Sequence, residues 1–375
     1  MRSLNLLTIM ATEKTLDPTL TKILQSVWCD ELQTNLVDGG LVDSAVIDGD
    51  GAAQVTLKFP FAAQTTHADI VQRATTALRG LPEPKNVRIS CSTAIAPHAA
   101  QVGVERVVSV RNMIAVASGK GGVGKSTTTV NLALALAQEG AKVGVLDADI
   151  YGPSIPTMLG ITGRPESEDG TMIEPKEGHG LQVSSIGFLI DKDDAMIWRG
   201  PMVTQALEQL LRQTKWRDLD YLLIDMPPGT GDIHLTLAQR VPITGALIVT
   251  TPQEVALIDA RKGLRMFQKV SVPVLGLIEN MNLHICSSCG HHEHIFGHGG
   301  AQALSQELQV PFLGSLPLEM RIRQDADSGR PTVVSDPDSD VSAVYRTLAR
   351  QVSVAISRMK ADMSGKFPKI VVQAT

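Results

Sequence analysis

The feature that most constrains the fold of this chain is a glycine-rich run between an apolar segment and a helical one. The run satisfies the phosphate-loop pattern G-x-x-x-x-G-K-[ST]. Residues 113–117 before it are typical of a buried strand, and residues 126–138 after it carry an apolar helical face that ends at Gly140. Backbone N–H groups and the helix dipole make such a junction an anion site. The loop residues are Gly119, Lys120, Gly121, Gly122, Val123, Gly124, Lys125, Ser126 and Thr127.

Apolar strands and helical stretches alternate along most of the chain after this loop. Nearly all-apolar strands that alternate with helices predict an α/β fold with a mainly parallel sheet that helices cover on both faces. Ligands of such sheets lie outside the carboxyl ends of the strands. We expect strands at 113–118, 142–147, 181–186, 220–225, 245–251, 273–279 and 312–316. We expect helices at 201–213, 253–269, 300–309, 319–328 and 338–358.

The first part of the chain is predicted to form a separate small α+β domain with the order α-β-β-α-β. Its expected helices are 20–27 and 68–78, and its expected strands are 40–47, 53–59 and 86–91. The turn Asp48-Gly49-Asp50-Gly51 favours a hairpin between the first two strands. The predicted organisation is a disordered or over-extended start at 1–14, the small domain at 15–95, a linker at 96–112, the phosphate-loop domain at 113–360 and a tail at 361–375.

Carboxylates follow two of the predicted strands of the large domain. Asp147 and Asp149 leave one strand two residues apart, a spacing that suits magnesium, a positioned water or only a capped turn. Tyr221-Leu222-Leu223-Ile224-Asp225 is an apolar strand that ends in aspartate. This is the Walker-B pattern, whose carboxylate holds Mg²⁺, usually through water. The sequence therefore predicts a magnesium and phosphate site at this edge of the sheet.

Composition and net charge restrict the classes of partner that this chain is expected to bind. The net charge of −5 and the pI near 6.0 argue against a nucleic-acid surface, which needs clustered Lys and Arg. Four cysteines in 375 residues are too few for a disulfide framework, so we expect a reducing, cytoplasmic setting. No apolar run reaches the length of a membrane span, and we expect no membrane partner. Cys29 and Cys91 are interpreted as buried apolar residues.

The lysine inside the loop, in the run Lys120-Gly121-Gly122-Val123-Gly124-Lys125-Ser126, resembles the deviant phosphate-loop ATPases. That group holds MinD, ParA and the nitrogenase iron protein. The resemblance implies that Lys120 reaches the nucleotide of a partner subunit, that Asp149 activates the attacking water, and that Asp147 lies nearer the metal shell. It also implies that Asn280 reads adenine.

A C-x-x-C pair lies in a polar insert after the strand that ends near Asn280. Cys286 and Cys289 can share one metal, with Gly290 easing the turn. A pair of this kind can also be redox-active or inert. A mononuclear Cys₂His₂ zinc site is a competing interpretation, because five of the nine histidines lie in this stretch. They are His284, His291, His292, His294 and His298.

The number of cysteine ligands favours an iron–sulfur cluster over a mononuclear zinc site. One C-x-x-C supplies two sulfurs, whereas a [4Fe–4S] cluster typically takes four, and a two-fold dimer presents the pair twice. With these motifs together, the chain resembles the Mrp/ApbC family of iron–sulfur cluster carriers over nearly its whole length. The small domain resembles one found in iron–sulfur assembly factors, although Phe61-Ala62-Ala63-Gln64 stands where relatives often carry cysteine.

The resemblance implies a slow ATPase that binds ATP, Mg²⁺ and an iron–sulfur cluster shared by a homodimer. It further implies that apo iron–sulfur proteins and cluster-assembly factors are the partners. The alternative is a positioning ATPase similar to ParA or MinD, with a structural zinc at the cysteine pair. An electron donor similar to the nitrogenase iron protein is a second alternative, but its cluster cysteines are widely separated in sequence, unlike Cys286 and Cys289.

Overall fold

The computed structural model describes residues 15–80, 86–101, 103–167, 170–189, 200–286 and 288–362. The start predicted to be disordered at 1–14 and most of the predicted tail lie outside these residues. Contacts divide the chain into two compact units, Met1–Ala94 and Ile95–Thr375. Each unit is described by itself below. Within the described ranges, no helix has both the length and the apolar character needed to cross a bilayer.

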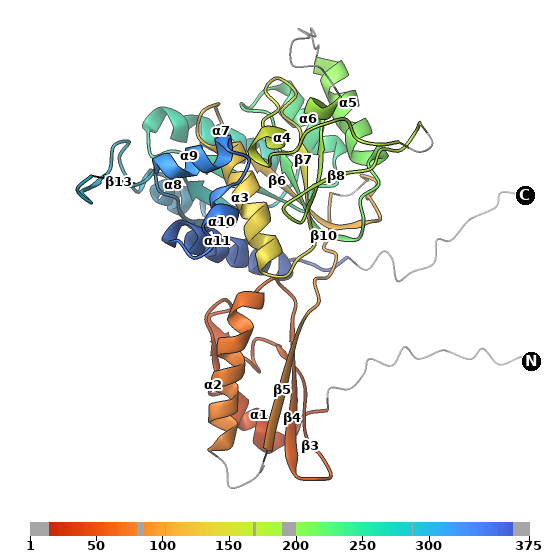
Figure 1. Cartoon of the computed structure of the whole chain (residues 1–375), viewed down its shortest axis with the longest axis vertical. Coiled ribbons are helices and arrows are strands. Elements are labelled where there is room, and N and C mark those ends of the chain that lie inside the picture. Colours follow the sequence, from red (N-terminus) through yellow and green to blue (C-terminus); the bar gives the residue numbers. More distant parts are fainter. Residues whose placement is uncertain are drawn as a thin grey trace, which may run out of the picture. The chain divides into compact units, whose positions relative to one another are not determined.

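The first unit has the predicted order of elements. A hairpin of β3 (Val42–Ile47) and β4 (Ala52–Phe59) is extended by β5 (Asn86–Thr93), which pairs in parallel with β4 (Figure 1). Two helices pack on one another and on this sheet, α1 (Pro18–Leu24) and α2 (His67–Arg79). Two short strands, β1 (Trp28–Cys29) and β2 (Thr34–Asn35), and a 3₁₀ turn η1 (Gln64–Thr66) complete the unit.

The two cysteines of the first unit, both predicted to be buried, differ in burial, and the Cys29 thiol donates to Glu31 Oε2 at 3.5 Å. Cys29 is buried and Cys91 is half-buried. Burial raises the pKa of Cys29 to about 11, so its thiol stays protonated near neutral pH. Phe61 is fully buried and stacks edge-on to Phe59, with ring centroids 5.7 Å apart. The segment after β4 therefore contributes to the apolar core of this unit.

The second unit is the predicted α/β domain. Its eight-stranded sheet has the order β15-β12-β11-β6-β10-β7-β9-β8, and every pairing except the β8–β9 edge is parallel. The strands are β6 (Val110–Ala117), β7 (Val143–Asp147), β8 (Lys176–Gly178), β9 (Leu181–Ser185), β10 (Leu219–Asp225), β11 (Gly245–Thr250), β12 (Val274–Glu279) and β15 (Phe312–Ser315). The strand over 113–118 starts at Val110, three residues into the predicted linker.

Helices cover both faces of this sheet. One layer holds α3 (Lys125–Gln138) against α11 (Asp340–Ser357), with α4 (Ile155–Met158), α9 (Met320–Asp327) and α10 (Thr332–Ser335) around them (Figure 1). The other layer holds α5 (Gly200–Gln213), α6 (Asp232–Arg240), α7 (Glu254–Lys269) and α8 (Gly300–Leu308). In this layer α6 packs between α5 and α7, and α7 also packs against α8. A short 3₁₀ turn, η2 (Ile186–Phe188), follows β9. Because β6 lies at the centre, its side chains alternate between the two apolar layers.

Residues of the predicted linker pack within the second unit. His98 is buried, and its backbone N–H donates to Asn112 Oδ1 at 3.1 Å. Asn112 Nδ2 in turn donates to Ala96 O at 3.0 Å, so this side chain fixes the segment on the start of β6. Ala99 N also donates to Lys360 O at 3.0 Å, which pairs this segment with the chain after α11.

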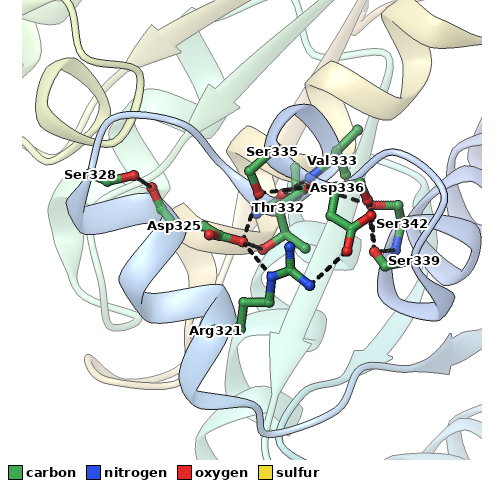
Figure 2. Close-up of polar contacts among 10 residues, drawn as sticks. Arg321, Asp325, Ser328, Thr332, Val333, Ser335, Asp336, Ser339 and Ser342 are labelled. Carbon is green, nitrogen blue, oxygen red and sulfur yellow. Dashed lines mark hydrogen bonds and ion pairs between the residues drawn. The ribbon is translucent and has the colours of Figure 1, made fainter.

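A polar network holds α9, α10 and α11 together behind α3. Asp325 accepts hydrogen bonds from Thr332 Oγ1 at 2.9 Å and Ser335 Oγ at 2.8 Å, as Figure 2 shows. Arg321 pairs with Asp336 at 2.6 Å. Because α10 is so held, its backbone is a firm support for the helix that follows the phosphate loop.

Two side chains of that helix contact this support. Asn131 Oδ1 accepts from Val333 N at 3.2 Å, and Gln138 Nε2 donates to Val333 O at 2.9 Å. Asn131 is fully buried, so these bonds are protected from water. These two contacts fix the middle and the end of α3 against α10.

Candidate functional site

The phosphate loop lies where the sequence predicts it, between β6 and α3. The strand ends at Ala117 and the helix begins at Lys125, so the first helical N–H groups face the loop. Gly122 and Gly124 have φ values of +82° and +81°. Only glycine adopts this left-handed backbone without a steric cost, and the loop could not turn into α3 in this way with other residues.

Two neighbouring segments hold the loop from either side. A Cβ on Gly119 would lie 2.3 Å from the backbone carbon of Asp259 in α7. A Cβ on Gly124 would lie 2.1 Å from Nδ2 of Asn280, just after β12. The close approach of Asp259 was not predicted, because no local pattern in α7 indicates it. Glycine at 119 is therefore required by the backbone of α7, and at 124 the Asn280 side chain occupies the space that a Cβ would need.

The centre of the site is a buried ion pair. Lys125 Nζ lies 2.6 Å from Asp225 Oδ1, and the Lys125 side chain is 6 % exposed while that of Asp225 is fully buried. Ser126 Oγ donates to Asp225 Oδ2 at 2.6 Å. Thr129 Oγ1 donates to Asp225 Oδ1 at 2.9 Å. Sequence analysis missed Thr129, although its position four residues after Lys125 puts both on one helical face.

A second carboxyl group lies beside this pair. Asp147 and Asp225 are register partners on adjacent parallel strands, and Asp147 is fully buried. Ser185 Oγ donates to Asp147 Oδ2 at 3.0 Å, a contact that no sequence motif predicts. Burial, followed by the charge of Asp225, raises the pKa of Asp147 to about 8. Burial beside Asp225 therefore favours the protonated form of Asp147.

Asp149 lies near the same buried ion pair and is more exposed to solvent than Asp147. Its side chain is half-buried, and burial raises its pKa, opposed by the positive charge of Lys125. Its backbone N–H donates to Asp147 Oδ1 at 3.2 Å, so the two carboxyl groups of the Asp-x-Asp motif are placed by one turn. A carboxylate in this position can accept a proton from water within reach.

These donors fit a nucleoside phosphate with a divalent cation. Mg²⁺ prefers oxygen ligands, and hydroxyl and carboxyl oxygens of Ser126, Asp147 and Asp225 converge here. The N–H groups at the start of α3 and the ammonium of Lys125 are the complementary groups for phosphate oxygens. In the structure, the ammonium of Lys125 pairs with the carboxylate of Asp225.

Two further predicted residues border the loop in different ways. Lys120 is half-exposed, and within the described ranges its ammonium has no carboxylate partner. Its carbonyl oxygen accepts from Ser118 Oγ at 3.0 Å. Asn280 is buried, and its Nδ2 donates to Val123 O at 2.8 Å. The Asn280 amide thus contacts the phosphate loop itself.

The segment after β10 also packs against the phosphate loop. Gly229 N donates to Ser118 O at 3.1 Å, which ties this Pro-Pro-Gly turn to the loop. His234, in the first turn of α6, is buried and hydrogen-bonded to the backbone of Pro227 and Pro228. Burial lowers the pKa of His234, so a neutral imidazole supports this turn. Sequence analysis missed His234, because a single histidine in a helix carries no spacing signal.

The cysteine pair lies on a small hairpin, β13 (His284–Ile285) with β14 (His292–Glu293), which extends from the second unit in Figure 1. Cys286 N donates to His291 O at 2.9 Å, and Gly290 N donates to Cys286 O at 2.8 Å. Gly290 has φ +69°, the left-handed conformation expected at this turn. Cys286 is half-buried and Cys289 is exposed.

The turn stabilises the thiolate of Cys286. The backbone N–H of Ser288, then that of Cys289 and the Cys289 thiol, lower the pKa of Cys286. The thiolate is the form of cysteine that binds metal. The hairpin thus presents one half-buried and one exposed cysteine, and its backbone favours the thiolate of the first.

The histidines of this insert are partly engaged elsewhere. His284 Nδ1 is 2.9 Å from Leu318 O, and His294 Nδ1 is 2.6 Å from Asn282 O. The rings of His294 and His298 stack with centroids 4.5 Å apart. Within residues 15–362, leaving out the undescribed gaps, no three His, Cys, Asp or Glu side chains are placed to hold a metal ion.

Comparison with protein families matches both units. Residues 109–353 match the family model described as NUBPL iron-transfer P-loop NTPase. Residues 19–91 match the model described as iron-sulfur cluster assembly protein. The "Iron-sulfur cluster carrier protein" of Escherichia coli strain K12 is 54 % identical over 308 residues, which are 82 % of this chain and 84 % of that protein.

Solved structures match the second unit. A nucleotide-binding protein in complex with ADP, from Archaeoglobus fulgidus, is 38 % identical with a TM-score of 0.55, over 62 % of this chain and 91 % of that one. The cell division ATPase MinD of Pyrococcus furiosus is 24 % identical with a TM-score of 0.50, over 64 % of this chain and 98 % of that one. The second of these similarities concerns the fold alone.

Proposed function

The chain belongs to the family of iron–sulfur cluster carrier P-loop NTPases, and on that premise we propose that it hydrolyses ATP slowly and delivers a cluster to apo-proteins. The cluster, its cargo, is held between two copies of the chain. Cluster-assembly factors are its other partners. A reducing compartment, such as the cytoplasm, suits this activity because it keeps exposed thiols free.

The observation that carries the proposal is the Cys286–Cys289 turn. It presents two sulfurs at the surface, and backbone N–H groups stabilise the Cys286 thiolate. A disulfide or a purely structural role does not require a thiolate, whereas iron and zinc do. The same unit carries the complete phosphate loop, so nucleotide binding and metal binding are two properties of one domain.

A second copy of the chain completes the ligand set. One protomer offers Cys286 and Cys289, and a [4Fe–4S] cluster typically takes four thiolates. Two-fold symmetry brings the same pair from each subunit to one axis. The side chains of Ile285 and Ile295 beside the turn are 37 % and 50 % exposed. Burial of these apolar groups against their copies would favour the same arrangement.

The nucleotide site is proposed to work by charge placement. Lys125, which pairs with Asp225 in the structure, would contact the β- and γ-phosphates, and Ser126, Asp225 and Asp147 would hold Mg²⁺, which would screen phosphate charge. Asp149 positions the attacking water and accepts its proton. Asn280, whose Nδ2 donates to Val123 O at 2.8 Å, is proposed to contact the base with the remaining hydrogen-bonding capacity of its amide.

Lys120 is proposed to act across the dimer. Its ammonium is half-exposed and has no carboxylate partner within the described residues, so it is free to reach a neighbouring subunit. We expect Lys120→Ala to bind nucleotide normally and to lose about 100-fold or more in ATP turnover. Mixing it with Lys125→Ala protein should restore part of the activity, because a mixed dimer regains one site with both lysines. Phosphate release from the mixture measures this, and a mixture no faster than its components would contradict the role in trans.

Anaerobic reconstitution with iron and sulfide tests the cluster. A [4Fe–4S] cluster shared by two chains predicts about two iron atoms per chain, a brown absorbance band and a dimer by size exclusion. Oxygen or a chelator should then release the iron and weaken the dimer. The control for this reconstitution is the same protein treated with zinc in place of iron.

The competing function is a positioning ATPase with a structural zinc. It predicts a colourless protein with one zinc per chain, bound by Cys286, Cys289 and two histidines of the insert. Alanine at His284, His291, His292 or His294 would release that zinc. A stable one-to-one zinc complex that depends on these histidines, with no iron uptake, would overturn the carrier proposal.

A further inference from the structure

The segment that leads from the phosphate loop to the cysteines is short and hydrogen-bonded at nearly every residue. It begins at Asn280, whose Nδ2 donates to Val123 O at 2.8 Å. The amide also occupies the space beside Gly124 that a Cβ would need, at 2.1 Å. Asn280 is only six positions before Cys286. Asn280 therefore connects the phosphate loop to the root of the hairpin.

Met281 has an unusual backbone that ties the next residue to Asn280. Its φ is +59°, a left-handed conformation that is strained for a methionine. Its N–H donates to Asn280 Oδ1 at 2.9 Å, so both polar atoms of the Asn280 amide are engaged. Backbone strain of this kind persists only where the surroundings impose it, and it is common at switch regions.

The other side of the hairpin root is tied to the segment after β15. Asn282 N donates to Leu316 O at 3.1 Å, and Leu318 N donates to Leu283 O at 2.8 Å. His284 Nδ1 lies 2.9 Å from Leu318 O, two residues before Cys286. The next bond along the hairpin is that of Cys286 N with His291 O. The hairpin root is thus braced between the phosphate loop and residues 316–318.

We propose that residues 280–284 form a coupling segment through which the state of the phosphate loop sets the position and reactivity of Cys286 and Cys289. Met281 is its positioning residue. When Lys125 exchanges Asp225 for phosphate, the loop that carries Val123 rearranges, and the engaged amide of Asn280 shifts with it. Because coupling between two sites is reciprocal, loading of the cysteines changes nucleotide affinity by the same factor. The inference rests on the proposed nucleotide site.

The test measures cysteine reactivity in the full-length, reduced, cluster-free protein. Iodoacetamide labelling is followed by peptide mass spectrometry, with and without Mg²⁺ and ADP or a non-hydrolysable ATP analogue. We expect nucleotide to change the labelling rate of Cys286 and Cys289 about fivefold or more. Cys29 and Cys91, in the first unit, are the internal controls and should label at unchanged rates.

Met281→Gly should abolish this nucleotide effect, because glycine frees the backbone at the turn. Nucleotide affinity, measured by calorimetry, should stay within about threefold of the parent. Met281→Asn should keep the effect, since asparagine adopts the left-handed conformation readily. Gln309→Gly is the matched control: it places glycine at φ +53° after α8 and should behave as the parent.

The outcomes separate the two proposals. Nucleotide that binds but leaves all labelling rates unchanged would overturn the coupling and leave the proposed function intact. A full nucleotide effect in Met281→Gly, or its loss in Met281→Asn, would overturn the role of the Met281 backbone. Failure of the parent protein to bind nucleotide would overturn the proposed function and the coupling together.

Discussion

Lys125→Ala should lower ATP turnover by about 100-fold to 1000-fold, the range seen when one charge-stabilising donor is removed from a transition state. Its ammonium is buried beside Asp225 and Ser126, the residues proposed to hold Mg²⁺. No other lysine forms an ion pair with Asp225 in the described part of the chain. Phosphate release at saturating Mg²⁺ and ATP measures the loss.

The control must separate chemistry from folding. Removing Lys125 leaves Asp225 buried without its cation, which costs about 3–5 kcal/mol if the carboxylate stays charged. Thermal unfolding should therefore accompany the assay, and Lys125→Gln, which keeps a donor, is the second variant. Lys142→Ala is the matched control, because Lys142 is exposed and pairs with Asp218 at the start of β10. Normal turnover in folded Lys125→Ala would refute the phosphate assignment.

Cys286→Ala and Cys289→Ala should each reduce the iron content of the reconstituted protein to near zero. Either change leaves two thiolates in the dimer where a cubane takes four, and a cluster with two ligands is labile. The loss is therefore nearly complete and not one half. Iron and sulfide analysis after desalting measures it, and ATP turnover should survive in part.

Cys91→Ala is the matched control for these variants. Cys91 is a half-buried thiol of the first unit, so its removal should leave iron content unchanged. Double alanine variants at His291 and His292 complete the set and should also leave iron in place. Full iron uptake by both cysteine variants would contradict the shared cluster, and loss of metal in the histidine variants would favour zinc.

Much of the fold could be predicted from the sequence, because buried parallel strands are apolar runs that end in glycine or a polar motif. Strand bounds at 143–147 and 274–279 lie within a residue of expectation. The helix α6 (Asp232–Arg240) was missed, since its short apolar face follows a Pro-Pro-Gly run that indicates a loop. The edge strand β8 (Lys176–Gly178) was missed because a three-residue hairpin strand has no periodicity.

The contacts within the candidate site could be predicted from the sequence less completely than the fold. Motifs indicate which residues gather at the carboxyl edge, since parallel strands place their ends together. They carry no information on contacts between distant segments, such as the 2.6 Å approach of Lys125 to Asp225 or the bond from Asn280 to Val123. The left-handed Met281 was also beyond prediction, because nothing in an isolated methionine indicates a positive φ.

The proton on Asp147 has a consequence for the cell. Asp147 and Asp225 are fully buried register partners on adjacent strands, and a single negative charge is tolerated there far better than two. A divalent cation supplies the charge that lets Asp147 ionise, so metal and proton compete for the same oxygen. With the proposed magnesium site, we expect metal–nucleotide binding to weaken as the pH is lowered, because protons then compete with the cation for the Asp147 carboxyl group.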